Sequence, residues 1–148
     1  MFIKSTIAIG SDHGGYELKQ QLIPFLEAKG LTVIDAGSNS SESVDYPEFG
    51  QKVAKIVVSN KAEAGIIICG TGIGISIAAN RIEGARASLC HSVEYAELTR
   101  LHNDSNILAL GGRFNTEESA KAIVQKWIST EFEGGRHQNR VNLLDSLK

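Results

Sequence analysis

The stretch GIIICGTGIGISIAANR, residues 65–81, decides the fold of this chain. Residues 65–69 are an apolar run without polar alternation, which is typical of a parallel strand buried on both faces. Glycines follow at 70, 72 and 74 and predict a tight turn, because glycine tolerates backbone conformations that other residues avoid. The apolar pattern then continues as a short helix near 75–81. Strand, turn and helix in this order form one unit of an α/β protein.

The same alternation of short apolar runs and helical patterns extends to both ends of the chain. It predicts further strands at 3–10, 31–36, 85–90 and 106–110, and further helices at 15–29, 47–59, 92–102, 116–130 and 138–147. Pro24 lies inside the first of these helices and predicts a kink or an early break there. The pair Gly134–Gly135 predicts a hinge before the last helix.

Strands that alternate with helices predict a parallel sheet with helices on both faces. We therefore expect a three-layer α/β/α sandwich with a Rossmann-like, five-stranded parallel sheet, built as one domain over residues 1–148. The order of the strands does not follow from the sequence. Ligands of such sheets bind beyond the carboxyl ends of the strands, so the loops after the first, third, fourth and fifth strands should carry the chemistry.

The charge and the hydropathy of the chain limit the kinds of partner that it can bind. The 148 residues carry a formal net charge of −2, which provides no general attraction for nucleic acid or a membrane surface. No run approaches the roughly 20 apolar residues of a membrane helix. Residues 1–15 read as a first strand instead of a secretory segment. We expect a cytoplasmic protein that holds any anionic ligand in a local cluster.

The glycine turn is the strongest candidate for such a cluster. Its successive N–H groups can point into one concavity, and a helix N-terminus behind it stabilises negative charge. It lacks the spacing of the dinucleotide fingerprint and the Lys-Ser/Thr of a P-loop. At the mouth of the turn, Cys69 is placed to act as a thiolate in acyl transfer or proton abstraction. The alternatives are that the turn binds no ligand and that Cys69 is a small buried hydrophobic residue. We interpret Cys90 in that second way.

Three other polar groups are candidates. Asp12 and His13, in the glycine-flanked loop after the first strand, suggest a polar ligand close to the backbone, although Asp12 is equally suited to cap a helix. His102 and Asn103 end a helix, where a histidine suits proton transfer or simply interacts with the helix dipole.

In the C-terminal tail, Arg136 and Arg140 share a helix face, which suits a phosphate or a solvated surface. Arg113 adds a third positive group that we expect at the same edge. The four histidines, at 13, 91, 102 and 137, are scattered without a paired-ligand spacing. We therefore expect no metal and no cofactor.

Taken together, these segments resemble the type B ribose-5-phosphate isomerases, in the family that also contains subunits of galactose-6-phosphate isomerase. The matching stretches are GSDHGG (10–15), SVDYPEF (43–49), IIICGTGIGISIAANR (66–81), LTRLHND (98–104), ILALGGR (107–113) and EGGRHQNRV (133–141). They occur in order over nearly the whole chain, and their combination is far more specific than any one of them.

The resemblance implies an aldose–ketose isomerase that interconverts ribose 5-phosphate and ribulose 5-phosphate in the non-oxidative pentose phosphate pathway. Cys69 would be the base, His102 would open the sugar ring with help from Asp12, and His137 is a lesser candidate for that step. The backbone from Gly70 to Gly74 would hold the enediolate. The implied catalytic set is Cys69, Thr71, His102 and Asp12; the implied substrate-binding set is Asp12, His13, Tyr46, Gly70, Thr71, Gly72, Ile73, Gly74, Asn103, Arg113, Arg136, His137 and Arg140.

The resemblance also implies a homodimer or a pair of dimers with the active site between subunits. Some members of the family use a glutamate base in the helix after the glycine loop, but residues 75–77 here are Ile-Ser-Ile, which leaves Cys69 in that role. Two alternatives stay open: an isomerase of a six-carbon sugar phosphate, such as allose 6-phosphate or galactose 6-phosphate, and a binding module that does no catalysis.

Overall fold

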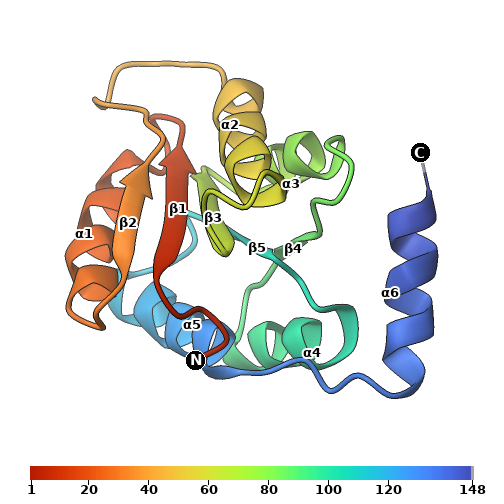
Figure 1. Cartoon of the computed structure of the whole chain (residues 1–148). Helices are drawn as coiled ribbons and strands as arrows, with labels where there is room; N and C mark the ends of the chain where they lie inside the picture. The colour runs from red at the N-terminus through yellow and green to blue at the C-terminus, as the bar shows by residue number, and fades with distance from the viewer. Residues whose placement is uncertain (148) are drawn as a thin grey trace.

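The computed structural model describes residues 1–147 and confirms a chain in which strands and helices alternate (Figure 1). The elements in order are β1 (Thr6–Ser11), α1 (Tyr16–Glu27), β2 (Thr32–Asp35), α2 (Tyr46–Val58), β3 (Ala64–Cys69), α3 (Ile73–Asn80), β4 (Ala87–Leu89), α4 (Val93–Asn103), β5 (Ile107–Gly111), α5 (Glu117–Ser129) and α6 (Arg136–Ser146).

All strand pairs are parallel, and the order across the sheet is β2-β1-β3-β5-β4. From β1 the chain passes through α1 to one edge of the sheet, whereas from β3 it passes through α3 toward the other. The loops that leave β1 and β3 therefore diverge, which creates a switch point between these two neighbouring strands. A crevice at a switch point is where open α/β sheets bind ligands.

The three predicted layers follow from the alternation of side chains along the strands. Ile66 and Ile68 of β3 pack into a core with α1, α4 and α5, and this core includes Trp127. Ile67 and Cys69, one residue out of phase, pack into the core under α2 and α3. Every residue of β3 is buried, as its unbroken apolar sequence predicts. The side chain of Cys69 is thereby directed to the face that carries the glycine turn and α3.

Several predicted bounds are wrong for identifiable reasons. The first strand was expected from residue 3, but the amides of Lys4 and Ser5 donate to the Glu63 carboxylate instead of to a strand. The fourth was expected from residue 85, but the Arg86 amide donates to the side chain of Asn106. The remaining strand and helix bounds differ from prediction by three residues or fewer.

Pro24 does not break α1 early, because the helix continues to Glu27. A proline this close to a helix end removes one hydrogen bond and leaves little helix beyond it to disturb. The predicted hinge at Gly134–Gly135 coincides with the start of α6: both residues have positive φ, and Gly135 is the residue before the helix.

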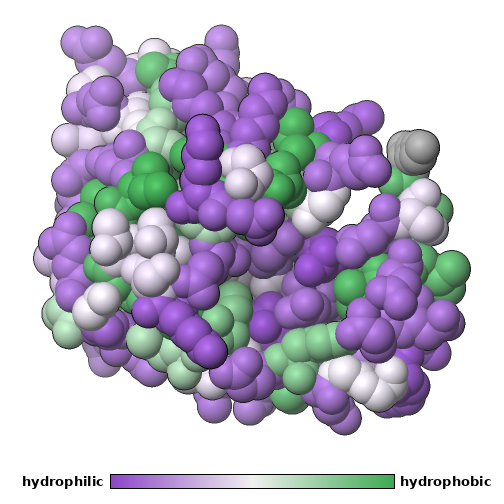
Figure 2. All heavy atoms as spheres, viewed as in Figure 1, coloured by the Kyte–Doolittle hydropathy of each residue, from purple (hydrophilic) through white to green (hydrophobic). Residues whose placement is uncertain are grey.

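Helix α6 stands apart from both helical layers and contacts α4 (Figure 1). Figure 2 shows the surface hollowed between α6, at the right, and the body. A cavity of about 630 Å³ lies there, lined by residues 80–88 together with Asn103, Leu144, Asp145 and Leu147. Leu143 of this helix and Leu147, the residue just after it, are more than half exposed. Across residues 1–147, no helix combines the length and the apolar character needed to span a bilayer.

Candidate functional site

The loops after β1 and β3 touch each other at the switch point. A Cβ on Gly14 would lie 3.0 Å from the amide nitrogen of Gly70, so a side chain there would press on the backbone of the other loop. Asp12 is 6% exposed, and its Oδ1 accepts a hydrogen bond of 2.8 Å from the Gly14 amide. This contact orders the loop and does not cap α1, whose preceding residue is Gly15.

Cys69 lies directly beneath the glycine turn. The amide of Gly72 donates to its Sγ at 3.1 Å, and the amide of Ile73 donates to the Thr71 hydroxyl at 3.1 Å. Gly72 has a φ of +79°, which directs its amide inward, and α3 begins at the next residue. An N–H that donates to sulfur stabilises negative charge on it. Cys69 is buried, with 5% of its surface exposed, because it is the last residue of a strand buried along its whole length.

The two cysteines differ in surroundings. Cys90 is 1% exposed, and burial raises the pKa of its thiol to about 12. It therefore remains a neutral thiol and behaves as the small buried hydrophobe that we expected.

Tyr46 and Arg113 flank the glycine turn. The Tyr46 ring packs on Gly74 so closely that a Cβ there would lie 2.5 Å from it, and the Arg113 guanidinium packs on Gly70. The Arg113 amide also donates to the Gly70 carbonyl at 3.0 Å.

His13, beside Asp12, accepts a hydrogen bond from the Val44 amide through Nδ1. This bond leaves Nε2 as the nitrogen that carries the proton in the neutral ring. The structure thus brings Asp12, His13, Tyr46, Cys69, residues 70–74 and Arg113 to one edge of the sheet.

The other predicted residues lie at the opposite edge. Helix α4 begins beyond the carboxyl end of β4 and ends before the start of β5, and its 11 residues span about 16 Å. His102 and Asn103 at its end are therefore remote from Cys69 within one chain. Asp12 and His102 are thus far apart within one chain, and the help that Asp12 is expected to give His102 stays a prediction for two chains. The expectation that Arg113 shares an edge with Arg136 and Arg140 is wrong, since α6 starts beside the end of α4.

The opposite edge brings together groups that we expected to be scattered. The imidazoles of His102 and His137 stack with ring centroids 4.4 Å apart, and Oε2 of Glu133 lies 3.7 Å from Nε2 of His137 and 4.0 Å from Nε2 of His102. Burial, together with the charges of His102 and Arg136, lowers the pKa of His137. Sequence reasoning missed Glu133, although it stands four residues before His137.

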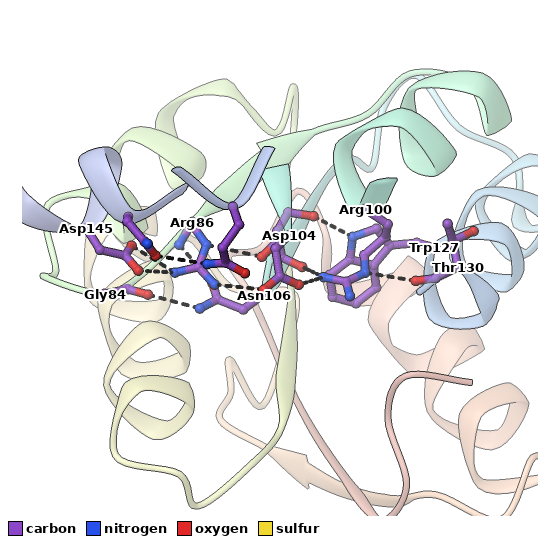
Figure 3. A network of polar contacts seen from close by, with 11 residues as sticks. Gly84, Arg86, Arg100, Asp104, Asn106, Trp127, Thr130 and Asp145 are labelled. Carbon is purple, nitrogen blue, oxygen red and sulfur yellow. Dashed lines mark hydrogen bonds and ion pairs between the residues drawn. The ribbon is translucent and has the colours of Figure 1, made fainter. Parts of the chain in front are cut away.

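A network of ion pairs holds α4 and α6 in place (Figure 3). Arg86 binds both carboxylate oxygens of Asp145 on α6, at 2.9 and 3.1 Å, and also contacts Asp104 just after α4. Asp104 in turn accepts a hydrogen bond of 2.8 Å from the buried Arg100. Sequence reasoning missed this network. The four-residue spacing of Arg100 and Asp104 is one that places side chains in contact on a helix, but nothing in the sequence shows that Arg86 meets Asp104 and Asp145.

These features define the class of protein: an α/β protein with a polar site at the switch point of a parallel sheet. Residues 7–144 match the model of the Ribose/Galactose Isomerase family, and the chain belongs to that family.

Relatives of known structure or activity are similar to this chain over almost its whole length. It is 46% identical over 142 residues to ribose-5-phosphate isomerase B of Escherichia coli K12, a match that covers 96% of this chain and 95% of that protein. The structure of ribose-5-phosphate isomerase B from Clostridium thermocellum superimposes with a TM-score of 0.94 at 52% identity, covering 95% of each chain. The Mycoplasma genitalium enzyme with bound ribulose 5-phosphate gives a TM-score of 0.93 at 39% identity, covering 97% of this chain and 95% of that one.

Proposed function

We propose that this chain is a ribose-5-phosphate isomerase of type B, with Cys69 as the base that moves the proton. The observation that carries the assignment of the base is the position of its Sγ, 3.1 Å from the Gly72 amide at the end of a central strand. The relatives from Escherichia coli and Clostridium thermocellum, both named ribose-5-phosphate isomerase B, match 96% and 95% of this chain and support the assignment of the reaction.

The reaction needs a base and a set of donors in the same place. The Cys69 thiolate takes the proton from C2 of the open-chain aldose, and the electron pair of that bond forms the C1–C2 double bond of an enediolate. Backbone amides of the glycine turn stabilise the charge that develops on oxygen. Return of the proton to C1, together with transfer of the hydroxyl proton from O2 to O1, gives the ketose, with O2 as the new carbonyl oxygen and O1 as a hydroxyl. Proton and electron pair are conserved, so no redox partner is needed.

The remaining groups are proposed to come from a second copy of the chain. His102, Arg136 and Arg140 lie at the edge of the sheet opposite to Cys69, and α6 stands off the body with exposed leucines. A homodimer in which α4 and α6 of one copy reach the glycine turn of the other would complete the site. His102 would then open the sugar ring, and the two arginines would bind the phosphate in the bidentate manner that guanidinium groups favour. Asp12, His13, Tyr46, Asn103 and Arg113 are proposed to bind the sugar and its hydroxyls.

Mixed dimers test this arrangement. The variants Cys69→Ala and His102→Ala are each expected to be inactive as homodimers. Unfolded and refolded together, they should regain activity, because one of the two sites in a mixed dimer then has both groups intact. The control is each variant refolded alone. If both groups act within the same chain, every site in a mixed dimer lacks one of them, and no activity returns.

A six-carbon sugar phosphate is the second candidate, because the family model spans ribose and galactose isomerases. The chemistry is the same and the pocket would only be deeper. Turnover of ribose 5-phosphate, allose 6-phosphate and galactose 6-phosphate by the same preparation decides between them: we expect kcat/KM to be highest for the pentose. A place in the pentose phosphate pathway follows from that substrate. The cytoplasmic location stays a prediction.

A further inference from the structure

We propose that His102, Glu133 and His137 form a binding site for a divalent transition-metal ion such as Zn²⁺. Each residue offers one ligand atom, and these three atoms lie within 4.8 Å of one another. Two imidazole nitrogens and one carboxylate oxygen form a donor set that suits zinc and leaves a fourth position for water or another ligand.

A second observation points to a ligand at the same place. The Nε2 atom of His137 is buried without a hydrogen-bond partner in the described chain, and the residue is 4% exposed. A buried polar atom without a partner is costly, and native structures rarely leave one. This nitrogen faces Oε2 of Glu133 at 3.7 Å, too far for a hydrogen bond but suitable for an ion between them.

The site must close slightly around the ion. Zinc bonds of about 2.0–2.2 Å place neighbouring ligand atoms roughly 3.4 Å apart, so the separations of Glu133 Oε2 from the two imidazole nitrogens, 3.7 and 4.0 Å, must shorten by less than about 1 Å. The two imidazole rings are stacked at an angle of 18°, and parallel rings cannot both direct a lone pair at one ion. The ring of His102 must therefore turn. Its side chain is 40% exposed and that of Glu133 is 56% exposed, so both have room to move against the fixed His137.

The neighbouring charges limit the affinity. Arg136 precedes His137, and Arg140 follows on the same helix, so a cation is repelled from that side. Glu133 is the one carboxylate of the triad and offsets part of this repulsion. We expect binding in the micromolar range, with Glu133 decisive for it.

The consequence of binding rests on the proposed function. An ion that engages Nε2 of His102 removes this imidazole from the acid–base step that opens the sugar ring. The metal would therefore inhibit the isomerase, in contrast to the activating role of metals in many enzymes. The site itself does not depend on the proposed function, so binding and inhibition are measured separately.

Binding is measured on the purified full-length protein, freed of metal by a chelator, with Co²⁺ as the probe. Cobalt bound by histidine and carboxylate gives visible absorption bands, and Zn²⁺ should displace it with a stoichiometry of one ion per chain. The measurement is made in the Cys69→Ala background, which removes the competing thiol. Glu133→Gln should weaken binding about tenfold or more. Glu131→Gln, which removes a nearby exposed carboxylate outside the triad, is the matched control and should bind as the parent does.

The proposed site would be wrong if Glu133→Gln bound Co²⁺ as tightly as its Cys69→Ala parent does. It would also be wrong if the Cys69→Ala parent bound no Co²⁺. Inhibition is then measured with the native Cys69: Zn²⁺ should inhibit the wild type and the Glu131→Gln variant at the concentration at which it binds, whereas Glu133→Gln should keep its activity. Binding without inhibition would leave the site intact and contradict the proposed role of His102 in turnover.

Discussion

The amide of Gly72 donates a hydrogen bond of 3.1 Å to the sulfur of Cys69. The bond joins the last residue of β3 to the residue that precedes α3, so the position of the sulfur depends on the left-handed backbone of Gly72. The turn thus serves both the fold and the proposed chemistry.

The substitution Gly72→Ala should lower both the stability of the fold and the rate of catalysis. A Cβ there would lie 2.6 Å from Leu89 Cδ1 and 2.8 Å from the Leu110 backbone, at a φ of +79°. The unfavourable φ alone costs about 1–3 kcal/mol, and the contacts add to it. Chemical denaturation and kcat should both report the change. Gly134→Ala is the matched control, because its φ is +71° but nothing lies within 4 Å of the added Cβ. A loss of stability no greater than that of the control would show that the close contacts do not matter.

The ion pair between Arg86 and Asp145 should orient α6. Asp145→Asn removes the charge from a pair that joins α6 to the segment before β4, at 2.9 Å. Both partners are partly exposed, so the free energy of unfolding should fall by at most about 1 kcal/mol. If α6 carries the phosphate-binding arginines, KM for ribose 5-phosphate should rise several-fold while kcat changes little. Glu117→Gln, which removes a pair within α5, is the control. An unchanged KM would show that the ion pair between Arg86 and Asp145 does not contribute to substrate binding.

Arg140→Ala should raise KM strongly for phosphorylated substrate. A charge-assisted hydrogen bond to phosphate contributes about 1.5–3 kcal/mol, which corresponds to roughly 10–100-fold in affinity. The residual turnover of unphosphorylated ribose at high concentration is the internal control and should be unaffected by the substitution. A KM equal to that of the wild type would remove Arg140 from the phosphate site.

Glu63 should make stability depend on pH in the acid range. Burial opposes its ionisation, but the amides of Lys4, Ser5 and Thr6 and the Ser5 hydroxyl outweigh that effect and lower its pKa below the ordinary 4.5. Because the folded pKa is the lower one, the stabilisation is complete above the unfolded pKa and is lost as the pH falls through the folded pKa.

Urea denaturation of Glu63→Gln and wild type at several pH values measures this contribution. The variant should be less stable near neutrality, and the difference should shrink as the solution is made acid. Glu27→Gln, a change at an exposed helix end, should show no such trend. A difference independent of pH would assign the effect of Glu63 to packing alone.

The fold could be predicted because local signals are strong. The unbroken apolar run of β3 and the glycines after it indicate a buried parallel strand and its turn, and the helical patterns on both sides predict the layers. Strand order could not be predicted, because it depends on which neighbours bury the most surface together. Strand ends were wrong wherever a side chain, such as Glu63 or Asn106, accepts the hydrogen bond that a neighbouring strand would otherwise take.

The candidate site was predictable in part for a similar reason. Asp12 directly follows β1 and Cys69 ends β3, so their proximity follows from topology once these two parallel strands are neighbours. The cluster of His102, Glu133 and His137 is formed by the end of one helix and the approach to another, and nothing in their spacing shows that these segments meet. The separation of the two groups of residues to opposite edges could likewise be seen only in the structure.

Exchange of solvent deuterium into the sugar tests the proposed role of Cys69 most directly. With ribose 5-phosphate in D₂O, the wild type should form ribulose 5-phosphate that carries deuterium at C1, to the extent that the abstracted proton exchanges. Cys69→Ala should still bind the sugar phosphate but should show neither isomerisation nor incorporation. Turnover and deuterium incorporation at the wild-type rate in Cys69→Ala would contradict a base at this position.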